Sequence, residues 1–412
     1  MATCCDDNEH DPNAKSVEEA LAIILAQSRS PEESMILPLD LALDRVLARD
    51  LLAPQAIPAW PNSAMDGYAV RVADGISPRK IVGSAYAGRP YVGTVLAGTA
   101  VRIMTGAPLP EGADAVVAQE QCTADDQTLQ LTHYPKQQEN IRGIGEDLAC
   151  GDLALAAGTW LRPSRIALAA SLGVAEIEVF RPLRVAFFST GDELQGLGES
   201  LRFGNIYDSN RHSLLALLRR LPLEVYDLGR IPDDQERIAE TLQRAARMAD
   251  LVITSGGVSV GDADYIARLL RDLGSVQFWK MNMKPGRPLA YGRIGDADFF
   301  GLPGNPVSTI VTFYQFVRPA LLKRMGVHAP WTVPSIRLPA AEPFRKKAGR
   351  TDFQRGRLVA GESGLAVAPV KAQSSHILTG MALADCFVIL PAAATDIPVG
   401  SLVDVQLLEG LV

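Results

Sequence analysis

The stretch from Ala249 to Tyr265 constrains the fold of this chain more than any other. Its apolar run, Leu251 to Thr254, has the length and β-branching of a buried strand. The run stops at Ser255-Gly256-Gly257, where two glycines allow a sharp turn that leaves backbone amides uncovered. Asp262 then provides a good N-cap for a helix. This order predicts an anion site at the carboxyl end of a strand in an open α/β sheet, although a tight turn that needs small residues would explain a single loop equally well.

Strands and helices alternate regularly from Leu183 to about Met325. Alternation of this kind predicts a mostly parallel sheet in a three-layer α/β/α domain. The predicted strands cover residues 184–189, 224–228, 251–254, 276–281, 288–292 and 299–301. The predicted helices cover residues 212–220, 234–248, 262–273 and 306–323.

The flanking regions have a different character. A capping box at Ser16-Val17-Glu18-Glu19 predicts a helix, and a second amphipathic helix is expected at about residues 40–48. Between residues 53 and 140, short apolar runs broken by glycine and proline predict a β-rich domain. Helical pattern returns at Pro163, so we expect the β-rich part to be an insertion between two helical pieces. The turn-rich tail after Gly326 predicts a small β-barrel.

Composition excludes several classes of protein. At 412 residues the chain is too long for a single ordinary core, and its net charge of −7 argues against a general nucleic-acid binder. The five cysteines are scattered without C-x-x-C spacing, so we expect neither a disulfide framework nor a zinc site, which fits a reducing cytoplasm. No apolar run approaches ~20 residues, and the N-terminal segment lacks the apolar core of a signal peptide, so no membrane span is expected.

Small polar residues and acids follow two strands of the predicted sheet. After the first strand, the Ser189 and Thr190 hydroxyls and the Gly191 amide are suited to phosphate, while Asp192 and Glu193 are suited to a hydrated cation. A polar turn with solvated acids is the alternative for this loop taken alone. The Ser255-Gly256-Gly257 loop likewise places small polar residues, followed by acids, after a strand. Turns alone would not require this combination at two strand ends of one sheet.

A basic cluster and a proline loop follow later strands. In an extended segment Lys280 and Lys284 would project to one side, and together with Arg287 they suit a phosphate ester or an oxoanion. The alternative is that these are solvated surface residues. In the loop at residues 302–308, Pro306 starts a helix whose first amides favour an anion, although a purely structural turn is again the alternative.

Three loops of the β-rich part carry acids or a hydroxyl. They are the turn with Asp66, the loop with Thr105, and the glycine-containing loop that ends in Glu146 and Asp147. Asp-Gly is by itself a common hairpin turn, so physical chemistry alone favours a structural role for Asp66. No H-E-x-x-H, G-x-S-x-G or phosphate-loop lysine motif is present, and the five histidines are too dispersed to suggest a metal site.

In this order, these motifs closely resemble the molybdopterin molybdenumtransferase family, to which a region of gephyrin is related. The resemblance runs from about Val17 to the C-terminus and rests on residues 62–69, 102–110, 145–147, 189–194, 255–265, 280–288 and 302–308. It implies an α/β multidomain protein with four domains. They are a discontinuous helical linker and dimerisation domain (15–55 and 145–180), an inserted β-rich domain (56–144), a three-layer α/β/α molybdopterin-binding domain (181–328) and a C-terminal β-barrel (329–412).

The resemblance also implies the residues of an active site. The family's catalytic positions fall on Asp66, Thr105, Asp147, Glu193, Asp233 and Asp264. Its substrate-binding positions fall on Ser189, Thr190, Gly191, Ser255, Gly256, Gly257, Lys280, Lys284, Arg287, Pro303 and Pro306, and on Ser374 or Ser375, which are adjacent. Arg287 stands where the family often has a lysine.

The implied reaction inserts molybdenum from molybdate into adenylylated molybdopterin and releases AMP. Mg²⁺ held by Glu193 and Asp264 would bridge the phosphate oxygens. The family further implies a homodimer with an active cleft shared between subunits, contact with the adenylyltransferase of the same pathway, and a cytoplasmic location. Neither nucleic acid nor a membrane is an expected partner.

Two other functions compete with this one. Adenylyl transfer to molybdopterin is compatible with the α/β domain alone, but the flanking β-rich and barrel domains favour metal insertion. A non-catalytic scaffold, like the related region of gephyrin, could dispense with the acids Asp66 and Glu193, which this chain retains.

Overall fold

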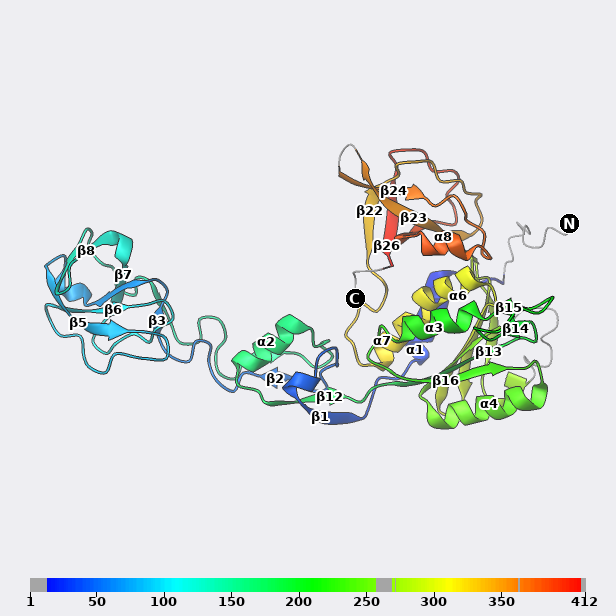
Figure 1. Ribbon diagram of the computed structural model, residues 1–412, viewed down its shortest axis with the longest axis horizontal. Helices are drawn as coiled ribbons and strands as arrows, with labels where there is room; N and C mark the ends of the chain where they lie inside the picture. The colour runs from blue at the N-terminus through cyan, green and yellow to red at the C-terminus, as the bar shows by residue number, and fades with distance from the viewer. Residues whose placement is uncertain (1–12, 257–268, 271, 362–363, 409–412) are drawn as a thin grey trace. The chain divides into compact units, whose positions relative to one another are not determined.

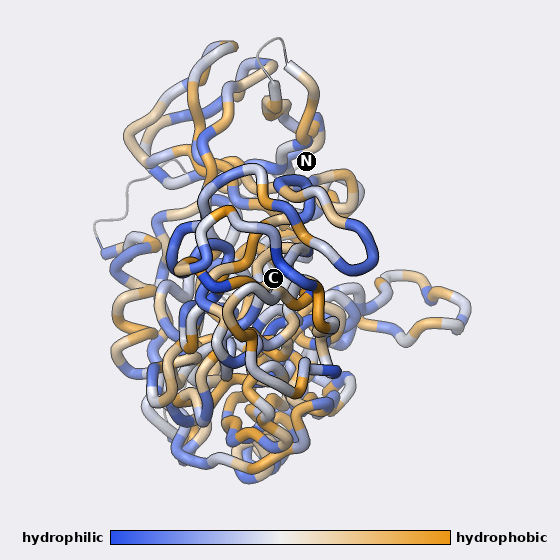
Figure 2. Tube along the Cα trace, turned by 90° about the vertical axis from the view of Figure 1, so that its left-hand side faces the viewer, coloured by the Kyte–Doolittle hydropathy of each residue, from blue (hydrophilic) through white to orange (hydrophobic). Residues whose placement is uncertain are grey.

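The computed structural model describes residues 13–256, 269–270, 272–361 and 364–408. The chain divides into two compact units (Figure 1). Unit 1 comprises Met1–Met35, Asp44–Val46 and Phe180–Val412, and unit 2 comprises Ile36–Leu43 and Leu47–Val179. Within the described residues, no helix is long and apolar enough to cross a membrane. Figure 2 shows hydrophobic and hydrophilic residues alternating at short intervals along the trace.

The main sheet of unit 1 has six strands in the order β16-β13-β17-β21-β20-β18. The first four are parallel to one another, and β20 and β18 are antiparallel to their neighbours. The sheet is therefore mostly parallel, as the alternation in the sequence predicts. The strands are β13 (Arg184–Thr190), β16 (Glu224–Ile231), β17 (Leu251–Ser255), β18 (Gln277–Lys280), β20 (Pro288–Ile294) and β21 (Ala297–Leu302).

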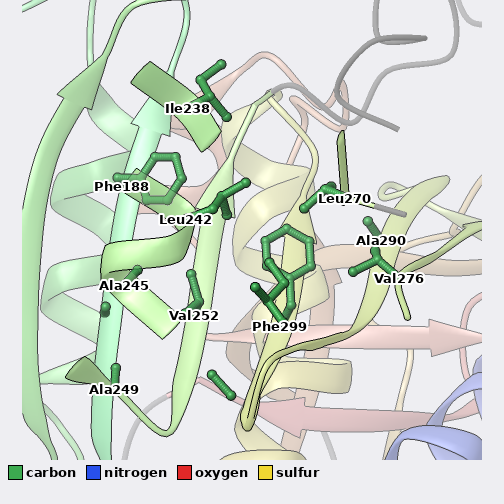
Figure 3. Packing of buried hydrophobic residues seen from close by; sticks show 13 residues of the cluster. Phe188, Ile238, Leu242, Ala245, Ala249, Val252, Leu270, Val276, Ala290 and Phe299 are labelled. Atoms are coloured by element: carbon green, nitrogen blue, oxygen red, sulfur yellow. The ribbon is translucent and has the colours of Figure 1, made fainter. Parts of the chain in front are cut away.

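Helices cover both faces of this sheet because its central strands are apolar on both faces. On one face, α4 (Gln235–Met248) packs Ile238 and Leu242 against Phe188, Val252 and Phe299 (Figure 3). On the other face lie α3 (Ser209–Leu218) and α6 (Pro306–Thr312), which contact β13 and β21 respectively (Figure 1). The short strands β14 (Leu194–Gln195) and β15 (Ile206–Tyr207) pair with each other after β13.

The predicted helix at residues 306–323 forms with a change of hydrogen-bond register. A π-helical turn, Phe313–Val317, connects α6 to α7 (Arg318–Arg324). Pro319 explains the change, because it lacks the amide hydrogen that a regular α-helix would use at that position.

The N-terminal helix α1 (Val17–Gln27) begins at the predicted capping box. The Glu19 amide donates to the Ser16 hydroxyl at 3.1 Å, and the Ser16 amide donates to the Glu19 carboxylate at 2.9 Å. The buried residues of α1, including Ala20 and Ile24, lie where the helix contacts α7 and the π-helical turn. The structure therefore groups α1 with unit 1 and not with residues 145–180.

A second sheet forms the C-terminal part of unit 1. Its strands follow the order β19-β23-β25-β26-β22, and β24 also pairs with β23. An isolated bridge between Ala340 and Val367 links the end of β22 to β24, so the strands curve around a core that contains Phe344 and Val388. The elements are β19 (Met283–Lys284), β22 (Ser335–Pro339), β23 (Thr351–Gly361), β24 (Gly364–Pro369), α8 (Leu378–Ala382), β25 (Cys386–Leu390) and β26 (Leu402–Leu407).

Unit 2 contains a six-stranded sheet in the order β7-β4-β6-β5-β9-β8, flanked by two separate apolar clusters. This agrees with the β-rich character predicted for residues 53–140. The strands are β4 (Gly67–Val70), β5 (Arg79–Ala85), β6 (Thr99–Ile103), β7 (Ala115–Ala118), β8 (Cys122–Ala124) and β9 (Thr128–Leu131). Four shorter strands form two further pairs: β2 (Leu51–Leu52) with β11 (Leu153–Leu155), and β3 (Asn62–Ser63) with β10 (Ile141–Arg142).

The predicted helix at residues 40–48 is wrong. Only a 3₁₀ turn, Leu39–Leu41, forms there, because Asp44 adopts a φ of 61° that a right-handed helix does not allow. Leu47 instead forms a bridge with Val179. Helix α2 (Pro163–Ser171) begins at its proline, as predicted, and the remaining strands are β1 (Ser34–Pro38) and β12 (Glu176–Phe180), which pair with each other.

Candidate functional site

Four parallel strands of unit 1 end at the same edge of the sheet. In the register of the sheet Ser189 lies opposite Ser255, and Ser255 lies opposite Leu302. The Gly256 amide also donates to the Leu302 carbonyl at 3.2 Å. The predicted phosphate loops and the proline loop therefore begin side by side at the carboxyl edge of the sheet.

Two buried hydroxyls at this edge lack a hydrogen-bond partner among the described residues. They belong to Ser189, which is 1% exposed, and Thr190, which is 6% exposed. An unpaired buried hydroxyl typically costs about 1–3 kcal/mol, so such groups indicate a place where a ligand supplies the missing bond. A small, mostly apolar hollow adjoins Thr190 and is lined by Thr190, Gly256 and side chains such as Phe188 and Phe299.

The glycines of the two loops are required by their surroundings. Gly191 has a φ of +147°, and a Cβ there would lie 2.6 Å from Glu193 Oε2. Gly256 has a φ of +91°, and a Cβ there would lie 2.6 Å from the Thr190 carbonyl oxygen. At Gly191 the positive φ favours glycine, and at Gly256 both the positive φ and the close backbone oxygen exclude any other residue. The Glu193 carboxylate thus lies directly beside Gly191.

Acidic side chains crowd next to these loops. The Asp233 amide donates to Asp192 Oδ1 at 3.1 Å. Burial raises the pKa of the Asp233 carboxyl, and the charges of Asp192 and Glu193 raise it further. A cation would relieve this repulsion. Among the residues that the structure describes, no three potential ligands are grouped as a metal site, and Asp262, Asp264 and Gly257 lie outside those residues.

The basic segment passes from the main sheet to the second sheet of unit 1. Lys280 ends β18 and Lys284 ends β19; both are exposed, whereas Met281 and Met283 between them are buried. This alternation agrees with the prediction that the two lysines project to one side. The Met281 amide donates to the carbonyl of Arg287 at 2.7 Å, which holds the three basic residues in one compact turn.

The proline loop meets the loop of the two adjacent serines. Val307, directly after Pro306, donates its amide to the Ser375 carbonyl at 3.2 Å. Arg355 lies beneath this loop and donates to the Ser374 carbonyl at 3.2 Å. It is 1% exposed, and this burial lowers the pKa of its guanidinium to about 10 although the charge of Asp352 raises it. Backbone hydrogen bonds therefore link the start of the proline loop to the end of β17, and the end of the proline loop to the serine loop.

Two residues that hold these loops were missed by sequence analysis. Arg355 supports the serine loop, and Asn210 of α3 donates to both Ser255 and Gly304. Neither residue carries a local signal. In the sequence, an arginine within a strand and an asparagine near the start of a helix look like ordinary polar surface residues. Only the tertiary structure shows that the first is buried and that the second joins two loops.

In unit 2, Asp66 and Thr105 are in direct contact. Both the amide and the hydroxyl of Thr105 donate to Asp66 Oδ1, each at 2.7 Å. These bonds, the amide first, lower the pKa of the Asp66 carboxyl, and the charge of Arg102 lowers it further. Asp66 is exposed, so its ionised carboxylate is open to a ligand.

Asp147 is exposed and lies in the loop after β10. Its amide donates to the Ile57 carbonyl at 3.0 Å. Because β10 pairs antiparallel with β3, this loop starts beside Asn62, at the opposite end of β3 from the turn that carries Asp66, and no contact joins the two carboxylates in the structure. The structure therefore brings Asp66 together with Thr105 and leaves Asp147 apart.

Comparison with known proteins identifies one family along most of the chain. Family models match residues 15–173 (MoeA N-terminal region, domain I and II), 186–323 (probable molybdopterin binding domain) and 337–408 (MoeA C-terminal region, domain IV). A molybdopterin molybdenumtransferase of Haemophilus influenzae is 42% identical over 395 residues, 95% of this chain and 98% of that protein. One from Nostoc is 33% identical over 84% of this chain and 82% of its own length. The crystal structure of a molybdopterin biosynthesis moeA protein from Pyrococcus horikoshii aligns with a TM-score of 0.83 at 27% identity, over 96% of this chain and all of that one.

Proposed function

This chain belongs to the MoeA family, and we propose that it inserts molybdenum from molybdate into adenylylated molybdopterin and releases AMP. It is accordingly a transferase of molybdenum cofactor biosynthesis. The observation that carries the proposed chemistry is the gathering of unpaired hydroxyls, glycine loops and acids at one edge of the unit 1 sheet. These groups match the charge and hydrogen-bonding capacity of a phosphate ester.

The substrate phosphates would bind at the ends of β13 and β17. The hydroxyls of Ser189, Thr190 and Ser255 supply donors, and the glycine loops allow backbone amides to approach closely. Donors that are already fixed in the folded protein stabilise charge that develops on the phosphate as the phosphoanhydride breaks. The Gly257 part of this binding set lies outside the described residues.

We propose Mg²⁺ as the accompanying cation. The crowded carboxylates of Asp192, Glu193 and Asp233 fit such an ion, because Mg²⁺ binds few protein carboxylates and keeps waters or phosphate oxygens as its other ligands. Glu193 and Asp264 are the proposed ligands. When bound, the ion neutralises charge on the phosphate oxygens.

Molybdate is a dianion, and Lys280, Lys284 and Arg287 are its proposed counter-charges. Ser374 or Ser375, and the loop with Pro303 and Pro306, would border the same region, since Val307 bonds to Ser375. The carboxylates of Asp66 and Asp147 would orient water or pass protons from the thiols of the substrate to the oxo groups that leave molybdate as water, with Thr105 holding Asp66 in its ionised form.

We also propose a homodimer whose cleft combines unit 1 of one subunit with the Asp66 loops of the other, because acids in both units are then used in one reaction. The four domains predicted above remain our proposed division, except that α1 packs with unit 1 and not with residues 145–180. The separate sheets and cores support the rest of the division. A cytoplasmic location and transfer of substrate from a molybdopterin adenylyltransferase complete the proposal.

The double variant Lys280→Ala/Lys284→Ala tests the molybdate site. We expect its KM for molybdate to rise more than tenfold in a molybdenum-insertion assay that follows AMP release, because two cationic partners are lost. Its melting temperature should change by less than about 3 °C, since both residues are exposed. The matched control is Lys347→Ala, an exposed lysine of the same unit, which should behave as wild type. Equal losses of stability and molybdate use would contradict the assignment.

A further inference from the structure

One side chain ties two loops of the carboxyl edge together. Asn210 donates from Nδ2 to the Ser255 hydroxyl oxygen at 2.9 Å and to the Gly304 carbonyl oxygen at 2.7 Å. A carbonyl oxygen only accepts hydrogen bonds, so the group facing Gly304 is the amide NH₂, and this settles which way the side-chain amide is turned. Both protons of that NH₂ are then used.

This arrangement determines the role of the Ser255 hydroxyl. Ser255 is 2% exposed, and its oxygen accepts a hydrogen bond from Asn210. The hydroxyl's own proton must therefore point to another acceptor. An anion placed beyond the end of β17 would supply that acceptor, so Asn210 makes Ser255 a donor toward the carboxyl edge.

The neighbouring proline loop is held in a corresponding way. The Thr309 hydroxyl donates to the Pro303 carbonyl at 2.6 Å, and Asn210 holds the Gly304 carbonyl. In a trans peptide the N–H points away from the C=O of the same unit. The amides of Gly304 and Asn305 are therefore turned away from Thr309 and Asn210, and neither donates to another group in the part of the chain that the structure describes.

We propose that Asn210 is a positioning residue for the phosphate of the adenylylated substrate. With the two protons of its amide group it directs the Ser255 hydroxyl and the amide of Asn305 toward a common anion. Thr309 orients the amide of Gly304 toward the same anion. Ser255 and the proline loop lie close enough for this, because Ser255 pairs with Leu302 in the sheet. The inference rests on the proposed function, since it concerns the phosphate of that substrate.

AMP is the probe for this proposal, measured by calorimetric titration of the full chain. Asn210→Ala should weaken AMP binding about tenfold, because a buried hydroxyl and a peptide lose their orientation toward a charged ligand. Asn210→Asp should weaken it at least as much, because its carboxylate would accept a hydrogen bond from the Ser255 hydroxyl and repel the Gly304 carbonyl oxygen. Molybdate binding should change less than twofold in both variants. The matched control is His212→Ala, an exposed position on the same helix, which should bind AMP as wild type does.

A double-mutant cycle separates positioning from simple structural support. If Asn210 acts through Ser255, then Asn210→Ala/Ser255→Ala should bind AMP within about twofold of Ser255→Ala alone. Unchanged AMP affinity in both Asn210 variants, equal losses for AMP and molybdate, or fully additive effects would each overturn the inference. A wild-type chain that binds no AMP would instead overturn the proposed function, so the two failures are distinguishable.

Discussion

At the scale of single residues, the surroundings of two site carboxylates shift their pKa values in opposite directions. Asp66 accepts two bonds from Thr105, which lower its pKa, whereas partial burial beside the acids Asp192 and Glu193 raises the pKa of Asp233. The first is suited to accept a proton or orient water at neutral pH. The second is suited to a site where a cation compensates the charge.

Asp66→Asn tests the role of that ionised carboxylate. The amide keeps the shape of the side chain but cannot accept a proton, so molybdenum insertion should fall about a hundredfold. Stability should be nearly unchanged because Asp66 is exposed. Asp125→Asn is the matched control: this carboxylate also accepts two local bonds, from the amides of Gln127 and Thr128, at 2.8 and 2.6 Å. If both variants insert molybdenum at the wild-type rate, Asp66 has no catalytic role.

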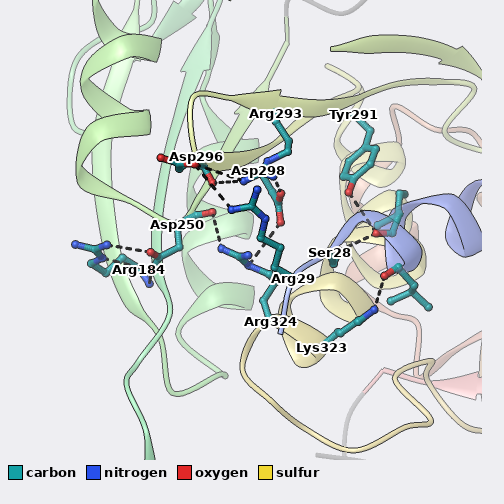
Figure 4. A network of polar contacts seen from close by, with 12 residues as sticks. Ser28, Arg29, Arg184, Asp250, Tyr291, Arg293, Asp296, Asp298, Lys323 and Arg324 are labelled. Atoms are coloured by element: carbon teal, nitrogen blue, oxygen red, sulfur yellow. Dashed lines mark hydrogen bonds and ion pairs between the residues drawn. The ribbon is translucent and has the colours of Figure 1, made fainter. Parts of the chain in front are cut away.

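At the scale of elements, ionic contacts fasten the start of β17 to the start of β13 (Figure 4). The Asp250 carboxylate accepts from Arg181 at 2.8 Å and from the Arg184 side chain at 2.9 Å. It also accepts from the Arg184 amide at 2.8 Å. Burial raises the pKa of Asp250, but these bonds outweigh burial and hold the pKa well below its usual range. The strand ends opposite the functional edge are thus anchored by charge.

Asp250→Asn should therefore destabilise the protein by about 3 kcal/mol at pH 7, because two arginines lose their anionic partner. A carboxyl whose folded pKa is depressed stabilises the fold above its unfolded pKa of about 3.8, and loses that contribution as the pH falls. The difference from wild type in urea unfolding should therefore be largest near pH 7 and shrink below about pH 4. The control is Asp296→Asn, in the same network but with a fully exposed carboxylate, which should change stability by less than about 0.5 kcal/mol. A pH-independent difference would contradict this account.

At the scale of the whole molecule, the proposed reaction needs acids from both units. Asp66 lies in unit 2 and Glu193 in unit 1, and no sequence pattern says whether one subunit or two supply a given cleft. A shared cleft in a symmetric dimer predicts that two different inactive variants complement each other, because a mixed dimer contains one cleft without a substitution.

Asp66→Asn and Glu193→Gln should each be inactive alone. After co-expression and random mixing, activity should return to about a quarter of wild type, since half the dimers are mixed and each has one intact cleft. The measurement is AMP release during molybdenum insertion, with separately purified variants, combined without exchange of subunits, as the control. Activity no higher than the sum of the parents would exclude a cleft shared in this way.

Much of the architecture follows from local patterns in the sequence. The strands and helices of the α/β sheet, the capping box of α1 and the glycine loops depend on periodicity, capping and backbone freedom, which are properties of neighbouring residues. Predicted elements such as β17 and α4 therefore form close to their expected bounds. The identity of the family followed from the order of several motifs, none of which would be specific alone.

The tertiary structure decided the features that depend on contacts between residues far apart in the sequence. No helix forms at residues 40–48; instead Leu47 pairs with Val179, which lies more than a hundred positions later in the sequence. The contacts of Asn210 span 45 and 94 positions, and those of Arg355 depend on its burial beneath the serine loop. Local propensity cannot encode such contacts, because the free energy that orients these side chains comes from groups that meet only after the sheet has formed.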